Sequence, residues 1–135
     1  MPRYRIPATR FGLETPSRLA WRARGLRRTI RQGRLPPGGR AFRLTDIAVR
    51  FGGVEFGVIL PESDISSARR IAQRIHTNIA ENSFASPGGG EFRVTCSIGV
   101  AEYIRKSEDT QALLERADRA LYQAKEDGRN RISFS

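Results

Sequence analysis

Two apolar runs separated by a glycine pair constrain the fold of this chain more than any other feature. In the first run, residues 47–51, an apolar side chain recurs at every second position. Gly52-Gly53 follows, and a second, mostly apolar run occupies residues 54–60 before Pro61. Because glycine supplies the positive φ values that a tight turn between antiparallel strands requires, this pattern predicts a β-hairpin that ends at the proline.

Two helices are predicted after the hairpin, each from apolar residues at helical spacing. Ser63 or Asp64 can cap the first helix, and Ser107 or Asp109 can cap the second. Gly128 stands where a left-handed residue ends the second helix. The apolar stripes consist of Ile65, Ala68, Ile71 or Ala72, Ile75 and Ile79, and of Leu113, Leu114, Ala117, Leu121 and Ala124. The spacing therefore predicts two helices that each bury one face.

Further strands are expected at residues 92–103 and 130–134, and the Gly- and Pro-rich stretch 33–39 is expected to be a loop. Residues 1–17 show no clean periodicity. Strand pairs that alternate with helices indicate an α/β fold of the α+β sandwich type, in which helices pack on a mostly antiparallel sheet.

The excess positive charge lies at the start of the chain. The formal net charge is +10, and residues 1–43 contain twelve arginines, no lysine and a single acid. The arginines and prolines thus set the front of the chain apart from the rest. A basic arm can bind phosphates, but this one has few aromatic residues between its arginines and no nucleic-acid-binding motif. No specific nucleic-acid partner is therefore expected. Such a composition also arises when GC-rich coding sequence is mis-started or read out of frame.

Composition excludes several other classes of protein. No apolar run approaches the roughly 20 residues of a membrane-spanning helix, so no membrane span is expected. The single cysteine excludes an internal disulfide and fits a cytoplasmic location, where thiols stay reduced. One histidine without a Cys/His cluster excludes a zinc site.

Three segments, in order, carry a family resemblance. Residues 46–56 read DIAVRFGGVEF, residues 97–101 read SIGVA, and residues 117–130 read ADRALYQAKEDGRN. They resemble the signature hairpin, the central strand, and the C-terminal helix with the start of the closing strand of GGDEF domains, the diguanylate cyclase family. The resemblance covers residues 42–135, as a partial GGDEF domain, and leaves residues 1–41 as an Arg- and Pro-rich, divergent N-terminal segment. The resemblance implies a nucleotidyl-cyclase-like palm. It also implies that active members work as homodimers, which join two GTP molecules into cyclic di-GMP and pyrophosphate with the help of Mg²⁺.

The sequence departs from the family at its magnesium ligands. Magnesium demands oxygen ligands, and the resemblance places one at the third position of the signature, which is Val54 here. Glu55, at the fourth position, points to the opposite face of the strand and cannot simply substitute. If Phe11-Gly12 is the family's turn after the first strand, Leu13 replaces its histidine and the chain begins too late to supply the first-strand aspartate. The first strand is then missing or divergent, no metal ligand is retained, and synthesis is impaired.

Residues that the resemblance assigns to the nucleotide are nevertheless retained. Gly52, Gly53, Lys125 and Arg129 match positions that contact GTP, and Lys125 and Arg129, one helical turn apart, could close on the same triphosphate. The alternative is that both cations only balance the dipole at the helix C-terminus. Glu55 is the acid that we expect to act in catalysis or nucleotide binding.

A second retained motif precedes the hairpin. Arg43-Leu44-Thr45-Asp46 matches the RxxD inhibitory site of the family in residue type and in its distance from Gly52. There the Arg and Asp bind the product, cyclic di-GMP, and Arg74 falls near another arginine of that site. An arginine fork suits guanine acceptors or phosphate, and a carboxylate accepts from guanine N–H groups.

Several interpretations therefore remain open. The chain could still synthesise cyclic di-GMP, or it could have lost synthesis and act as a cyclic di-GMP receptor through Arg43, Asp46 and Arg74. It could also be a truncated or mis-started product without a function of its own, or a purely structural dimerisation module. Val54 counts against synthesis, and the RxxD motif favours the receptor.

Overall fold

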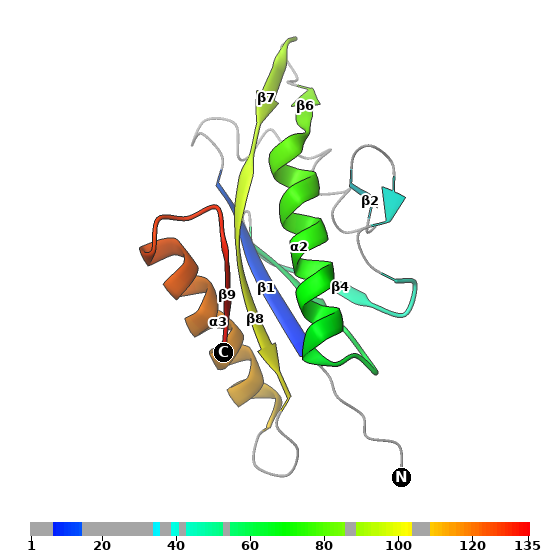
Figure 1. Cartoon of the computed structure of the whole chain (residues 1–135), viewed down its shortest axis with the longest axis vertical. Helices are drawn as coiled ribbons and strands as arrows, with labels where there is room; N and C mark the ends of the chain where they lie inside the picture. Colours follow the sequence, from blue (N-terminus) through cyan, green and yellow to red (C-terminus); the bar gives the residue numbers. More distant parts are fainter. Residues whose placement is uncertain are drawn as a thin grey trace.

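The main layer of the molecule is a five-stranded sheet in the order β4-β5-β1-β8-β9 (Figure 1). The computed structural model describes residues 7–14, 34–35, 39–40, 43–52, 55–85, 89–103 and 109–135. The strands are β1 Pro7–Glu14, β4 Ile47–Gly52, β5 Glu55–Ile59, β8 Thr95–Glu102 and β9 Ile132–Phe134. Pairing is antiparallel from β4 through β8, and β9 runs parallel to β8. The predicted α/β fold with a mostly antiparallel sheet is confirmed.

The first strand of the sheet is present, although its sequence is divergent. β1 pairs with β5 on one side and with β8 on the other, so it lies in the centre of the sheet. Phe11 and Gly12 lie opposite Phe56 and Glu55. The interpretation of Phe11-Gly12 as a turn after the first strand is therefore wrong, and so is the alignment of Leu13 that depended on it.

The two predicted helices are α2 Ile65–Glu81 and α3 Thr110–Glu126. Asp64 caps α2 by accepting from the backbone N–H of Ser67 at 2.7 Å, and Asp109 caps α3 through the N–H of Ala112 at 2.8 Å. Of the two cap candidates at each start, the aspartate is thus the one used. Gly128, after α3, has a φ of 112° and confirms the left-handed end.

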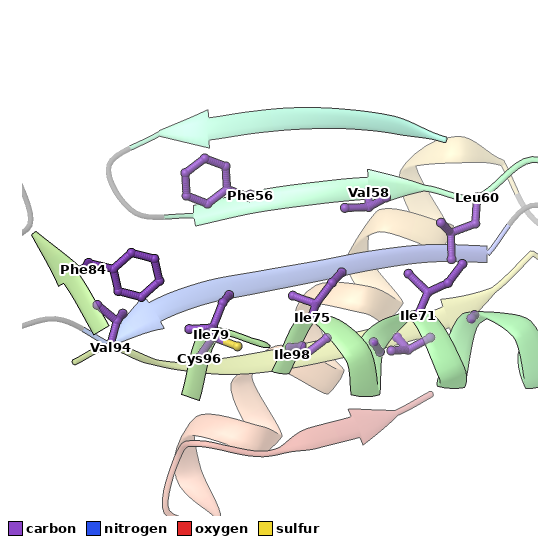
Figure 2. Packing of buried hydrophobic residues seen from close by; sticks show 13 residues of the cluster. Phe56, Val58, Leu60, Ile71, Ile75, Ile79, Phe84, Val94, Cys96 and Ile98 are labelled. Carbon is purple, nitrogen blue, oxygen red and sulfur yellow. The ribbon is translucent and has the colours of Figure 1, made fainter. Parts of the chain in front are cut away.

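The helices cover opposite faces of the sheet. The buried stripe of α2 packs on alternate residues of β5 and β8, among them Phe56, Val58 and Ile98 (Figure 2). The other face of β8 meets α3, where Ala101 packs with Leu113 and Ala117. Since successive strand residues point to opposite faces, β8 is buried on both sides between the helices.

The remaining described strands are short and refine the sequence expectations. The single strand expected at 92–103 is interrupted at Val94: β7 Glu91–Arg93 pairs with β6 Ser83–Ala85, and β8 follows. The loop expected at 33–39 contains one short ladder between β2 Arg34–Leu35 and β3 Gly39–Arg40. Both additions lie outside the five-stranded sheet.

Candidate functional site

Glu55 and Gly52 lie opposite each other where the β4–β5 hairpin begins to close. Glu55 is the first residue of β5 and also pairs across the sheet with Gly12 of β1. The hairpin predicted from the glycine pair is thus confirmed in its strands. Gly53 and Val54 lie outside the described residues, so their predicted roles stay predictions.

An ion pair joins two of the predicted site residues across the α3 face of the sheet. Lys125, in the last turn of α3, places its Nζ 3.2 Å from Oε1 of Glu55. About a third of each side chain is exposed, 31% for Lys125 and 36% for Glu55. An anionic ligand that enters this site must therefore compete with the Glu55 carboxylate for the ammonium group.

Arg129 lies just beyond α3 and close in sequence to this pair. Its φ of 63° is left-handed, and its backbone N–H donates to the carbonyl of Ala124 at 3.0 Å. Its side chain is exposed. Arg129 is thus part of the structured end of the helix, and its predicted contact with phosphate stays a prediction.

The two ends of the RxxD motif, Arg43 and Asp46, are hydrogen-bonded to each other just before β4. The carboxylate of Asp46 accepts from the Arg43 backbone N–H at 2.6 Å, from Arg43 Nη2 at 2.9 Å and from Arg43 Nε at 3.2 Å. Arg43 Nη2 also donates to the carbonyl of Pro61 at 2.9 Å and to the hydroxyl of Ser63. The motif thereby ties the segment before the hairpin to the turn that begins α2.

The arginines of this region line one pocket of about 260 Å³ on the outer side of α2. Arg43 and Arg74, both predicted, lie on its wall together with Arg70, which sequence reasoning missed. Ser67 and the largely buried Ile71 complete the described lining. Arg70 could have been found from its spacing, because residues four apart share one face of a helix. Asp46 is not among the described lining residues, and its side chain is fully buried.

The helix cap next to this pocket carries a perturbed acid. The pKa of Asp64 is lowered, first because the backbone N–H of Ser67 donates to its carboxylate, with the Ser67 side chain as a second donor and Arg70 as a nearby positive charge. Asp64 is therefore ionised throughout the neutral range, where it stabilises the start of α2.

Comparison with known proteins decides the family. Residues 39–131 match the family model described as diguanylate cyclase, GGDEF domain. This chain belongs to the GGDEF family. The domain is 42% identical over 93 residues to diguanylate cyclase A of Treponema denticola, covering 69% of this chain and 25% of that protein. It is also 42% identical over 91 residues to the response regulator PleD of Caulobacter vibrioides, covering 67% of this chain and 20% of that protein.

Solved structures agree with the fold of this GGDEF domain. The GGDEF domain of DgcB from Caulobacter crescentus, in complex with c-di-GMP, superposes with a TM-score of 0.76 at 23% identity over 97% of this chain and 78% of that chain. SiaD from Pseudomonas aeruginosa, in complex with its activator SiaC, gives a TM-score of 0.80 at 25% identity over 97% of this chain and 50% of that chain. The chain spans a quarter or less of the length of the two curated relatives above.

Family membership confirms the resemblance read from the three segments and connects this GGDEF domain with cyclic di-GMP signalling. Neither described helix has the length and apolar character needed to cross a bilayer. The family uses Mg²⁺. The described residues contain no group of three or more His, Cys, Asp or Glu side chains placed to hold a metal ion, and the carboxylate of Glu55 is paired with Lys125.

Proposed function

We propose that this GGDEF domain is a cyclic di-GMP receptor whose own synthesis of cyclic di-GMP is impaired. The observation that carries the proposal is the convergence of Arg43, Arg70 and Arg74 on one pocket. Cyclic di-GMP presents two phosphodiester anions and the acceptor edges of two guanines, and arginine forks bind both kinds of group. The DgcB domain that shares this fold was solved in complex with the same ligand.

The impairment follows from the chemistry at the hairpin. Val54 offers no lone pair where the family supplies an oxygen ligand to magnesium. Glu55 is already engaged by Lys125. A reaction that needs two positioned metal ions to neutralise a triphosphate therefore lacks ligands here.

Isothermal titration calorimetry of the purified chain with cyclic di-GMP tests the receptor. We expect measurable binding that Arg43→Ala and Arg74→Ala each weaken at least about tenfold, because each removes charge-assisted hydrogen bonds. Arg119→Ala, an exposed arginine on α3, is the matched control and should leave the affinity unchanged. Equal affinity of all three variants and the unaltered protein would refute the assignment of the pocket.

Incubation with GTP and Mg²⁺ tests the impairment, with nucleotide products separated by chromatography. We expect no cyclic di-GMP above the background of a heat-denatured sample. Clear turnover would contradict the loss-of-ligand argument. A folded protein with neither turnover nor cyclic di-GMP binding would favour a mis-started product or a purely structural dimerisation module.

The proposal extends to location and assembly. We place the domain in the cytoplasm, where the buried thiol of Cys96 stays reduced. A homodimer is the assembly in which family members bring two GTP molecules together. Analytical ultracentrifugation with and without cyclic di-GMP distinguishes a monomeric receptor from a ligand-linked dimer.

A further inference from the structure

The ladder between β4 and β5 is irregular at Phe51. Arg50 lies opposite Phe56 of β5. Gly52, two residues further along β4, lies opposite Glu55, which is only one residue away on β5. Phe51 is therefore the extra residue of a β-bulge. Bulges are common beside functional sites, where they change the direction of a side chain, and this one directly precedes the glycine pair.

The ring of Phe51 lies on Gly57, a glycine of β5. A Cβ built at Gly57 would be 2.5 Å from Cε2 and 3.2 Å from Cζ of the ring, so the ring occupies the space that any other side chain would need. Gly57 pairs with Val49, two residues before Phe51. The contact is thus a diagonal one across the two strands, which an aromatic side chain is long enough to make, and it holds the bulged residue against β5.

The bulge determines which residue lies beside Glu55. In a regular ladder, Phe51 would lie directly opposite Glu55, with the two Cβ atoms about 4.5–5.5 Å apart. With the bulge, the residue opposite Glu55 is Gly52, which has no side chain. The Glu55 carboxylate thereby has room on the α3 face of the sheet, where its Oε1 lies 3.2 Å from Nζ of Lys125.

From these contacts we infer that Phe51 is a positioning residue of the hairpin site, which comprises Gly52, Glu55 and Lys125. The ring on Gly57 holds the bulge, and the bulge keeps Gly52 opposite Glu55. Glu55 can then reach Lys125. Phe51 has no side-chain group that binds a phosphate or a metal ion, so it acts on the site through Glu55. The inference goes beyond the proposed receptor, because it concerns the hairpin and not the arginine pocket.

The ion pair can be observed directly, because Lys106 and Lys125 are the only lysines of the chain. Labelling lysine at ¹⁵Nζ gives two ammonium signals in NMR spectra, and Lys125→Met assigns them. In the unaltered protein, the Lys125 ammonium protons should exchange with solvent more slowly than in Glu55→Gln, because they are donated to a carboxylate. Phe51→Ala should raise the exchange rate to that of Glu55→Gln, whereas Phe51→Tyr, which keeps the ring, should retain slow exchange.

The register of the hairpin is the second measurement. A nuclear Overhauser contact between the backbones of Gly52 and Glu55 should be present in the unaltered protein and in Phe51→Tyr, and lost in Phe51→Ala. Val49→Ala is the matched control: Val49 is 38% exposed and pairs with Gly57, but it is not the bulged residue. This variant should change neither measurement. The same changes in Val49→Ala as in Phe51→Ala would indicate a general loosening of β4 and would overturn the inference.

Gly57→Ala tests the inference even if Phe51→Ala fails to fold. The added Cβ displaces the ring from β5 without removing it. We expect faster exchange at Lys125 and a weaker Gly52–Glu55 contact, while thermal denaturation shows a folded domain. Unchanged exchange and an unchanged contact in Gly57→Ala, or in a folded Phe51→Ala, would overturn the positioning role. All of these measurements use the protein without a ligand, so a failure to bind cyclic di-GMP would contradict only the proposed receptor.

Discussion

At Gly99 the backbone of α3 lies so close to β8 that the effect on stability of one added methyl group can be predicted. A Cβ built at Gly99 would collide with the carbonyl oxygen of Ala117 and the backbone nitrogen of Leu121, and would lie 2.9 Å from the carbonyl carbon of Ala120. These are backbone atoms of a helix, so no side-chain rotation relieves the contact. Helix and strand would have to separate by about 1 Å, which loosens packing along the whole α3 face.

Gly99→Ala should therefore destabilise the domain by about 2–3 kcal/mol, in the upper part of the range for overpacking. Without the collision, replacing a strand glycine by alanine would stabilise the folded domain by about 0.5–1 kcal/mol. The collision therefore determines whether Gly99→Ala lowers or raises the stability. Urea unfolding followed by circular dichroism gives the free energy of unfolding. The matched control is Gly57→Ala on β5, whose Cβ would meet Cε2 of Phe51 at 2.5 Å.

The Phe51 ring is 43% exposed and can move outward, so the control should cost less than about 1 kcal/mol. The reasoning is refuted if Gly99→Ala leaves the stability unchanged or raises it, or if Gly57→Ala costs as much.

Two further predictions concern the charges. Asp64→Asn keeps a good helix cap, so stability near pH 7 should change little. The pKa of Asp64 is lowered in the folded state, so its charge stabilises the fold above the unfolded pKa of about 4 and the contribution is lost as the pH falls through the folded value. Urea midpoints between pH 3 and 7 should thus fall less steeply for Asp64→Asn, and parallel curves would contradict this. Lys125→Met removes the partly exposed ion pair with Glu55 and should cost less than about 1 kcal/mol, a difference that shrinks in 1 M salt; a salt-independent loss would point to packing instead.

The elements predicted from the sequence are those whose signals are local. The hairpin has its glycine pair, α2 and α3 have apolar stripes at helical spacing, and each helix start has an aspartate whose side chain reaches a backbone N–H. The strand β1 has no such signal: Pro7–Glu14 contains an arginine, a glycine and a glutamate and does not alternate. It is a strand because β5 and β8 offer hydrogen bonds on both of its sides, which no window of sequence around it records.

The same distinction between local signals and long-range contacts applies to the candidate site. Family resemblance was enough to single out Glu55 and Lys125, but not to predict that they bind each other, because they are 70 residues apart and their contact depends on where α3 crosses the sheet. Arg43 and Arg74 were also singled out, and the structure brings them to one pocket. The burial of Asp46 could not be predicted, since it depends on the turn at Pro61 and Ser63 that completes the bonding of Arg43.

Loss of synthesis does not require loss of the arginine pocket, because the two sites are built from different contacts. The pocket depends on the bonds of Arg43 to Asp46, Pro61 and Ser63 and on the outer side of α2, which is anchored by its buried stripe and its Asp64 cap. The hairpin site depends on the opposite face of β5, where Glu55 meets Lys125 of α3. The metal ligand that we propose is lost with Val54 belongs to the second site, whereas the bonds that hold the first site are made by Arg43, Asp46, Pro61 and Ser63. A receptor without synthesis is thus a physically consistent state of this fold.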